Sequence, residues 1–175
     1  MERHDALMDV EIERFNKVLR SWTDPTIVVL RGHLYSESIL ERLIVHELPR
    51  GDRLVEEAGL SYRQKLAIGD ALNIIPDNII TFLRNLNRLR NALAHEMEKE
   101  IGDDDVERLC RPLGREYSSS REKALVDSSS IADPHSRALF VRLVVLRQSL
   151  AWSCGYVYGL TLGPARQSEN VEGVT

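Results

Sequence analysis

Long stretches in which apolar residues recur at every third or fourth position constrain the fold of this chain more than any other feature. No stretch shows the strict alternation of apolar and polar residues that marks a half-buried strand. The 10 glycines and 6 prolines lie mostly between the periodic stretches. The pattern therefore predicts an all-α protein, in which roughly five to six helices bury their apolar stripes against one another in a bundle.

Capping signals set the expected helix boundaries. Asp24 followed by Pro25 is typical of a helix start, and the Pro-Arg-Gly run at residues 49–51 is typical of a helix end. Ser61, with Gln64 three residues later, has the pattern of a capping box. Helices are thus expected over residues 5–20, 25–48, 62–72, 76–97, 104–116 and 137–160.

A single helical domain is expected over residues 1–163, since 175 residues are enough for one core. Within this domain, residues 117–136 contain two runs of three serines, and we predict a mobile surface loop there. The polar residues 164–175 are predicted to form a disordered tail.

Composition argues against several classes of protein. The chain has 27 acidic and 23 basic residues, so it lacks the positive charge of a protein that binds nucleic acid through its overall charge. Cys110 and Cys154 are too few and too far apart for a disulfide framework or a metal knuckle, and we expect them to be reduced core residues of a cytoplasmic protein. The apolar stretch 138–163 contains Arg142 and Arg147, which favours a buried helix over a membrane span.

The helix expected over residues 76–97 has one apolar face and one unusual polar face. The apolar face consists of Phe82, Leu83, Leu86, Leu89, Leu93 and Met97. The polar face consists of Arg84, Asn87, Arg88, Asn91 and His95. A solvated surface would favour Glu, Lys or Gln over the two asparagines, so this face is either an ordinary exposed surface or a binding surface.

Arg90 lies at the edge of the apolar face, where a guanidinium needs an acidic partner or an open groove. On the helix expected over residues 25–48, one face consists of Leu30, Leu34, Glu37, Glu41 and Ile44. Glu37 is therefore the predicted partner of Arg90. The pair is either an ion pair that fixes the packing of two helices or a carboxylate that orients an arginine acting on phosphate.

The segment Arg90-Asn91-Ala92-Leu93-Ala94-His95 resembles the motif of the HEPN superfamily, an arginine followed four to six residues later by a histidine. The upstream segments 31–40 and 60–66 are also similar to segments of family members, and the resemblance spans about residues 25–98. It implies an all-α bundle that pairs through its motif helices. Many such domains are metal-independent endoribonucleases of toxin–antitoxin, phage-defence and RNA-processing systems.

The chemistry implied by the resemblance is cleavage of RNA by its own 2′-hydroxyl. His95 would act as general acid or base, and Arg90 would donate hydrogen bonds to the non-bridging phosphate oxygens. Asn91 would orient His95 or contact a phosphate, and Glu37 would orient Arg90. The residues expected to bind the RNA backbone are Arg84, Arg88 and Asn87. No metal and no cofactor are expected.

A homodimer follows from the spacing of the motif. Arg90 and His95 are five positions apart, so they diverge by about 140° on a straight helix. Either the helix ends near His95, or the arginine of one chain works with the histidine of another. Two copies related by a two-fold axis would bring these two side chains together. Besides RNA, an antitoxin or a regulatory protein is a possible partner. In toxins paired with a nucleotidyltransferase antitoxin, a tyrosine often lies two residues after the histidine, where this chain has Met97.

Two alternatives stay open. One is a catalytically inactive HEPN-like regulatory or interaction module, because residues 60–75 also resemble the mannitol operon regulator family. The other, a small-molecule enzyme that binds phosphate, has little support because the chain has no glycine-rich phosphate loop. The histidines at positions 33, 46 and 135 are isolated in the sequence, and we interpret them as surface or satisfied core residues.

Overall fold

The computed structural model describes residues 23–96 and 98–163, together with Glu13, Phe15, Lys17, Leu19 and Ser21. Its helices are α2 (Pro25–Glu47), α3 (Gly51–Glu57), α4 (Tyr62–Ala71), α5 (Asp77–His95), α6 (Asp103–Cys110), the 3₁₀ helix η1 (Arg111–Leu113), α7 (Arg115–Asp127) and α8 (Pro134–Leu160). All regular structure in these ranges is helical, which confirms the all-α prediction. The tail 164–175 and most of the helix expected over residues 5–20 lie outside the described residues.

The capping signals place three helix starts. The side chain of Asp24 accepts a hydrogen bond from the backbone of Thr26 at 2.7 Å, as expected for the start of α2. At the start of α4, the backbone N–H of Ser61 donates to Oε1 of Gln64 at 2.9 Å, and the predicted capping box is present. α8 begins three residues earlier than expected, because Asp133 caps it.

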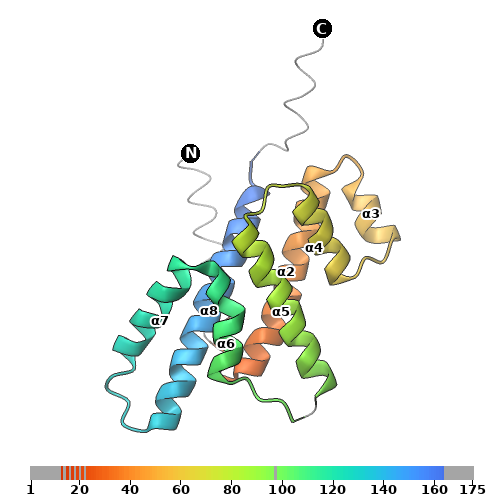
Figure 1. Ribbon diagram of the computed structural model, residues 1–175. Helices are drawn as coiled ribbons and strands as arrows, with labels where there is room; N and C mark the ends of the chain where they lie inside the picture. Colours follow the sequence, from red (N-terminus) through yellow and green to blue (C-terminus); the bar gives the residue numbers. More distant parts are fainter. Residues whose placement is uncertain are drawn as a thin grey trace.

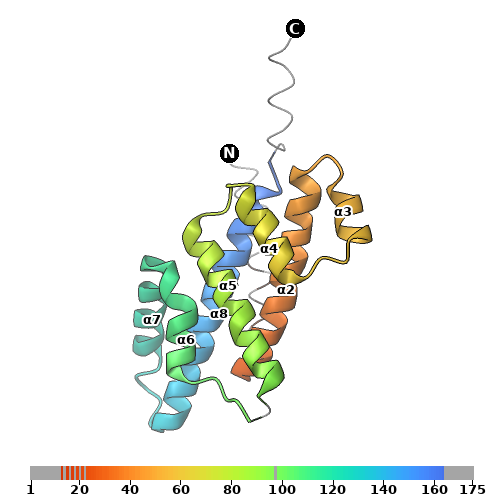
Figure 2. The same ribbon diagram turned by 45° about the vertical axis from the view of Figure 1, so that its right-hand side comes forward.

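α8 is the longest helix and lies at the centre of the bundle (Figures 1 and 2). It packs against α2 on one side and against α6 and α7 on the other, while α4 and α5 pack against α2. Most of the largest fully buried side chains come from α2, α5, α6 and α8, and they include Leu40, Leu43, Phe82, Leu86, Leu109, Leu146 and Leu150. Both cysteines are free and buried, and burial raises the pKa of each thiol to about 12.

The serine-rich segment 117–136 is not the predicted loop. Most of it forms α7 and the first turn of α8, and only residues 128–133 connect the two helices. Ala124 is fully buried, and Tyr117 packs against the core. Serine lowers helix propensity by only a few tenths of a kcal/mol, so the packing of α7 against α8 outweighs its local preference.

The helix expected over residues 104–116 is interrupted. α6 ends at Cys110, and Pro112 lies in the short 3₁₀ helix that follows. Gly114 then adopts a positive φ of 59°, a conformation that glycine adopts without a steric penalty. Because proline lacks a backbone N–H and glycine allows this sharp change of direction, the chain turns here from α6 into α7.

Candidate functional site

The C-terminal half of α5 carries the motif residues. Its apolar face is buried as predicted from Phe82 to Leu89, Leu93 packs partly against the core, and Met97 lies outside the described residues. The helix ends at His95, since Glu96 is extended with φ −113° and ψ 98°. His95 is exposed and forms no hydrogen bond or ion pair with any described residue.

A polar cluster lies where α2 crosses α5. His33 of α2 is 4% exposed, and its Nε2 donates to Oδ1 of Asn87 of α5 at 3.0 Å. The ring of His33 stacks on Tyr62 of α4 with the centroids 4.0 Å apart. Ser36 closes the cluster, because its Oγ donates to the backbone oxygen of His33 and lies 3.0 Å from the Tyr62 hydroxyl. Three helices are thus joined by polar contacts inside the bundle.

The electrostatics of His33 link this cluster to the motif. Burial lowers the pKa of His33, and the hydrogen bond that it donates to Asn87 and the charge of Glu37 partly oppose the effect. The charge of Arg90 lowers it further. Glu37 and Arg90 therefore both lie within electrostatic reach of one buried imidazole.

The lowered pKa of His33 predicts acid sensitivity. Above about pH 6.5 the histidine is neutral in both the folded and the unfolded state, so it does not lower the free energy of unfolding. As the pH falls from there towards the folded pKa, the unfolded chain binds a proton that the folded chain does not. The free energy of unfolding should then fall by at most about 1.4 kcal/mol per pH unit for this group.

Urea unfolding between about pH 7.5 and pH 5.5 checks this expectation. In His33→Gln, which keeps an N–H donor and does not titrate, the fall should be smaller. His135→Gln is the matched control, because His135 is exposed at the start of α8. Equal pH dependence in the wild type and in His33→Gln would contradict the assignment.

Glu37 has a different partner from the one predicted. Nζ of Lys65 lies 2.7 Å from Oε1 of Glu37 and 2.6 Å from Oε1 of Glu41, and the lysine side chain is only 8% exposed. Burial alone would lower the pKa of Lys65, but the two carboxylates outweigh it and the pKa is raised. Arg90 donates instead to Oδ1 of its neighbour Asn91 at 3.2 Å. The guanidinium has no carboxylate partner among the described residues.

Replacing Lys65 by methionine should destabilise the protein by about 2 kcal/mol. The change leaves two carboxylates one helical turn apart without their shared cation, and their partial exposure keeps the loss below that of a fully buried pair. Adding Glu37→Gln and Glu41→Gln to Lys65→Met should recover part of the loss. Lys123→Met on α7, which is exposed, is the control in the same urea unfolding experiment. A Lys65→Met protein as stable as the wild type would contradict the prediction.

The remaining predicted site residues separate into engaged and free side chains. Arg84 forms an ion pair with Asp70, and Asn87 is held by His33. Arg88 donates only to Oδ1 of Asn85, at 3.3 Å. Of the predicted RNA-binding residues, Arg88 is therefore the one whose charge no carboxylate of the described chain neutralises.

His33 and Lys65 were not among the residues predicted from the sequence. The signal for His33 was its position four residues before Glu37, which places both on neighbouring turns of one face of α2. Asn87 likewise precedes Arg90 by three residues on α5. For Lys65 the sequence held no signal, because its role depends on how α4 packs against α2.

Exposed apolar residues on α2 lie beside this site. Ile27, Leu30 and Leu34 are 42%, 37% and 62% exposed, and their spacing of three and four residues places them on one side of the helix. The contact between His33 and Asn87 sets the N-terminal half of α2 against the C-terminal half of α5. An apolar strip thus lies on the helix that packs against α5, which carries the motif residues.

A comparison of the chain with protein-family models, with curated proteins and with solved structures finds no match. Within the described ranges, no helix combines the length and the apolar character needed to cross a membrane. The same residues contain no group of three or more His, Cys, Asp or Glu side chains that could hold a metal ion.

Proposed function

We propose that the protein is a metal-independent endoribonuclease of the HEPN type. Its catalytic residues would be Arg90, Asn91 and His95. The observation that supports this function best is that Arg90 has no carboxylate partner among the described residues, because Lys65 takes the place beside Glu37. A half-buried arginine without an acid is suited to bind an external anion such as a phosphodiester.

The proposed site needs two copies of the chain. α5 is helical as far as His95, so the divergence of about 140° between Arg90 and His95 applies. Arg90 is half-buried towards α2, whereas His95 is exposed at the helix end. A symmetric dimer that covers Leu30 and Leu34 would bring the arginine of one copy to the histidine of the other.

Each residue then has a chemical task. In each site, His95 would accept the proton of the 2′-hydroxyl as the oxygen attacks phosphorus, and water would protonate the leaving 5′-oxygen. Arg90 would stabilise the charge that builds on the non-bridging oxygens. The products would be a 2′,3′-cyclic phosphate and a 5′-hydroxyl end, with no net change in oxidation state.

A second candidate is an inactive module of the same type. Two observations favour it: Arg84 and Asn87 are engaged inside the protein, and the net charge is −4. In this case the same surface would bind a second copy or another protein, and His95 would only interact favourably with the dipole at the C-terminus of α5.

Incubation of the purified chain with single-stranded RNA in EDTA tests the first proposal. We expect cleavage with 2′,3′-cyclic phosphate and 5′-hydroxyl ends, together with a dimer in light scattering. Intact RNA over a range of sequences would favour the inactive module. Products with 5′-phosphate ends would contradict the proposed chemistry.

A further inference from the structure

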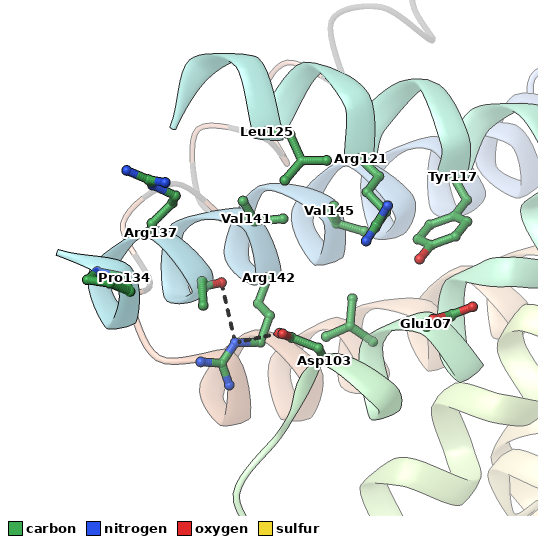
Figure 3. Close-up of a pocket in the computed structure, with 12 residues that line it drawn as sticks. Asp103, Glu107, Tyr117, Arg121, Leu125, Pro134, Arg137, Val141, Arg142 and Val145 are labelled. Atoms are coloured by element: carbon green, nitrogen blue, oxygen red, sulfur yellow. Dashed lines mark hydrogen bonds and ion pairs between the residues drawn. The ribbon is translucent and has the colours of Figure 1, made fainter. Parts of the chain in front are cut away.

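A groove of about 290 Å³ lies between α6, α7 and α8, away from the α2–α5 site (Figure 3). Its inner wall is apolar, because Val106 of α6 and Val145 of α8 are 5% and 1% exposed. Leu125 of α7, 46% exposed, lies at its edge, and Val141 lines it from α8. The volume suits a small molecule, since it lies at the lower end of the range of ligand pockets.

Two of the three arginines in the groove are engaged inside the protein. Arg137 donates twice to the backbone oxygen of Ile131, at 3.0 and 2.6 Å. Arg142 donates to the backbone oxygen of Ile101 at 2.6 Å and forms an ion pair with Asp103 at 3.2 Å. These two arginines hold the walls of the groove in place.

The third arginine and one acid of the groove have no partner among the described residues. Among the described residues, the side chains of Arg121 on α7 and Glu107 on α6 form neither a hydrogen bond nor an ion pair. Within the ranges that the structure describes, the groove thus contains one unpaired cation and one unpaired anion beside an apolar wall. A small ligand that carries both charges would match this arrangement.

The two free charges lie at the same end of the groove. Figure 3 shows Arg121 reaching from α7 into the space between Tyr117 and Val145. Burial and the charge of Glu107 raise the pKa of Tyr117, whereas the charge of Arg121 lowers it. Both charges therefore act on one hydroxyl group, and the opposite end is formed by residues such as Pro134 and Val141.

We propose that this groove binds a free α-amino acid with an apolar side chain. The carboxylate would bind Arg121, the ammonium group would bind Glu107, and the side chain would pack on Val106, Val141 and Val145. The Tyr117 hydroxyl would give a further polar contact. A simple fatty acid would place its carboxylate against Glu107, and a nucleotide would bring several negative charges to the same acid.

An NMR titration of the full chain with L-leucine tests the proposal, because changes in the amide chemical shifts report binding. We expect saturable shifts at the residues of the groove. The matched probes are 4-methylpentanoate, which lacks the ammonium group, and 3-methylbutylamine, which lacks the carboxylate. Each should bind at least about tenfold more weakly, because each loses one charge-assisted hydrogen bond.

Variants separate the groove from the rest of the surface. Arg121→Gln and Glu107→Gln should each weaken leucine binding about tenfold, and both side chains are exposed, so neither change disturbs packing. Val141→Trp should abolish binding by filling the groove. Arg115→Gln, an exposed arginine at the start of α7 that does not line the groove, is the matched control.

Three results would overturn the proposal: no saturable shifts with either leucine or phenylalanine, binding of the two single-charge analogues as tight as that of leucine, or unchanged binding in both Arg121→Gln and Glu107→Gln. The proposal is independent of the nuclease activity. His95→Ala should bind leucine like the wild type, whether or not the wild type cleaves RNA.

Discussion

His95→Ala should reduce RNA cleavage by about 10²- to 10⁴-fold if the proposed nuclease mechanism holds. The imidazole is the group of the motif that can both accept and donate a proton, so its loss removes proton transfer from the reaction. The fold should be unaffected, because His95 is exposed at the end of α5. Initial rates on a labelled RNA, measured in EDTA, give the ratio.

Arg90→Ala should also lose activity, by about 10²- to 10³-fold, since it removes the charge that stabilises the pentacovalent phosphate. The two inactive variants then test the shared site. When equal amounts of His95→Ala and Arg90→Ala are unfolded together and refolded, the mixture should recover about a quarter of the wild-type cleavage rate. Half of the dimers then contain one copy of each variant, and each of these mixed dimers has one of its two sites intact.

The controls distinguish chemistry from damage. His135→Ala, on the exposed first turn of α8, should cleave RNA like the wild type. Equal cleavage by the wild type, His95→Ala and Arg90→Ala would mean that the activity comes from another site or a contaminant. Absence of recovery in the refolded mixture would place Arg90 and His95 of one chain in the same site.

Local signals were enough to predict most of the helices. The caps at Asp24 and Ser61 act within a few residues, so the sequence contained the whole of their hydrogen bonding. The apolar spacing of α5 likewise predicted its buried face. Local signals did not predict the helix in residues 117–136, because α7 is stabilised by its packing on α8 rather than by the helix propensity of its own residues.

The features of the candidate site that lie within a single helix could be predicted from the sequence, whereas the contacts between helices could not. The motif residues could be found from the sequence, and the end of α5 was predicted at residue 97, two residues beyond its actual end at His95. The contact of the Asn87 side chain could not be predicted. A helical wheel does not show that α2 crosses α5 at that turn and provides His33 as a hydrogen-bond partner. The pairing of Glu37 with Lys65 depends on a third helix, and in the part of the chain that the structure describes it leaves Arg90 without an acidic partner.

α3 was missed for a related reason. The run 49–51 was interpreted as the end of one helix, which is correct for α2, but Gly51 is also the first residue of α3. The residue before it, Arg50, makes no side-chain hydrogen bond that would mark a helix start. Gly51 thus belongs to the run that ends α2 and is also the first residue of α3. This position predicts that the stability of the protein is unusually sensitive to a substitution of Gly51.

Gly51→Ala should destabilise the protein by about 3 kcal/mol and lower its melting temperature by about 9 °C. A Cβ at Gly51 would lie 2.2 Å from the backbone oxygen of Ile44 and 2.7 Å from the Cα of Val45. Both are backbone atoms of α2, so no side-chain rotation can relieve the contact. The backbone must move instead, which strains the 3.0 Å hydrogen bond from Gly51 to the oxygen of Leu48.

Gly163→Ala is the matched control for this substitution, because a Cβ at Gly163 would meet no atom within 4 Å. Differential scanning calorimetry of the two variants separates a close approach of two helices from the general effect of replacing glycine, which by itself stabilises by restricting the unfolded chain. A Gly51→Ala protein that melts with the wild type would show that α3 can move away from α2 at little cost. The tight turn between them would then be a consequence of the chain's path rather than a requirement of the fold.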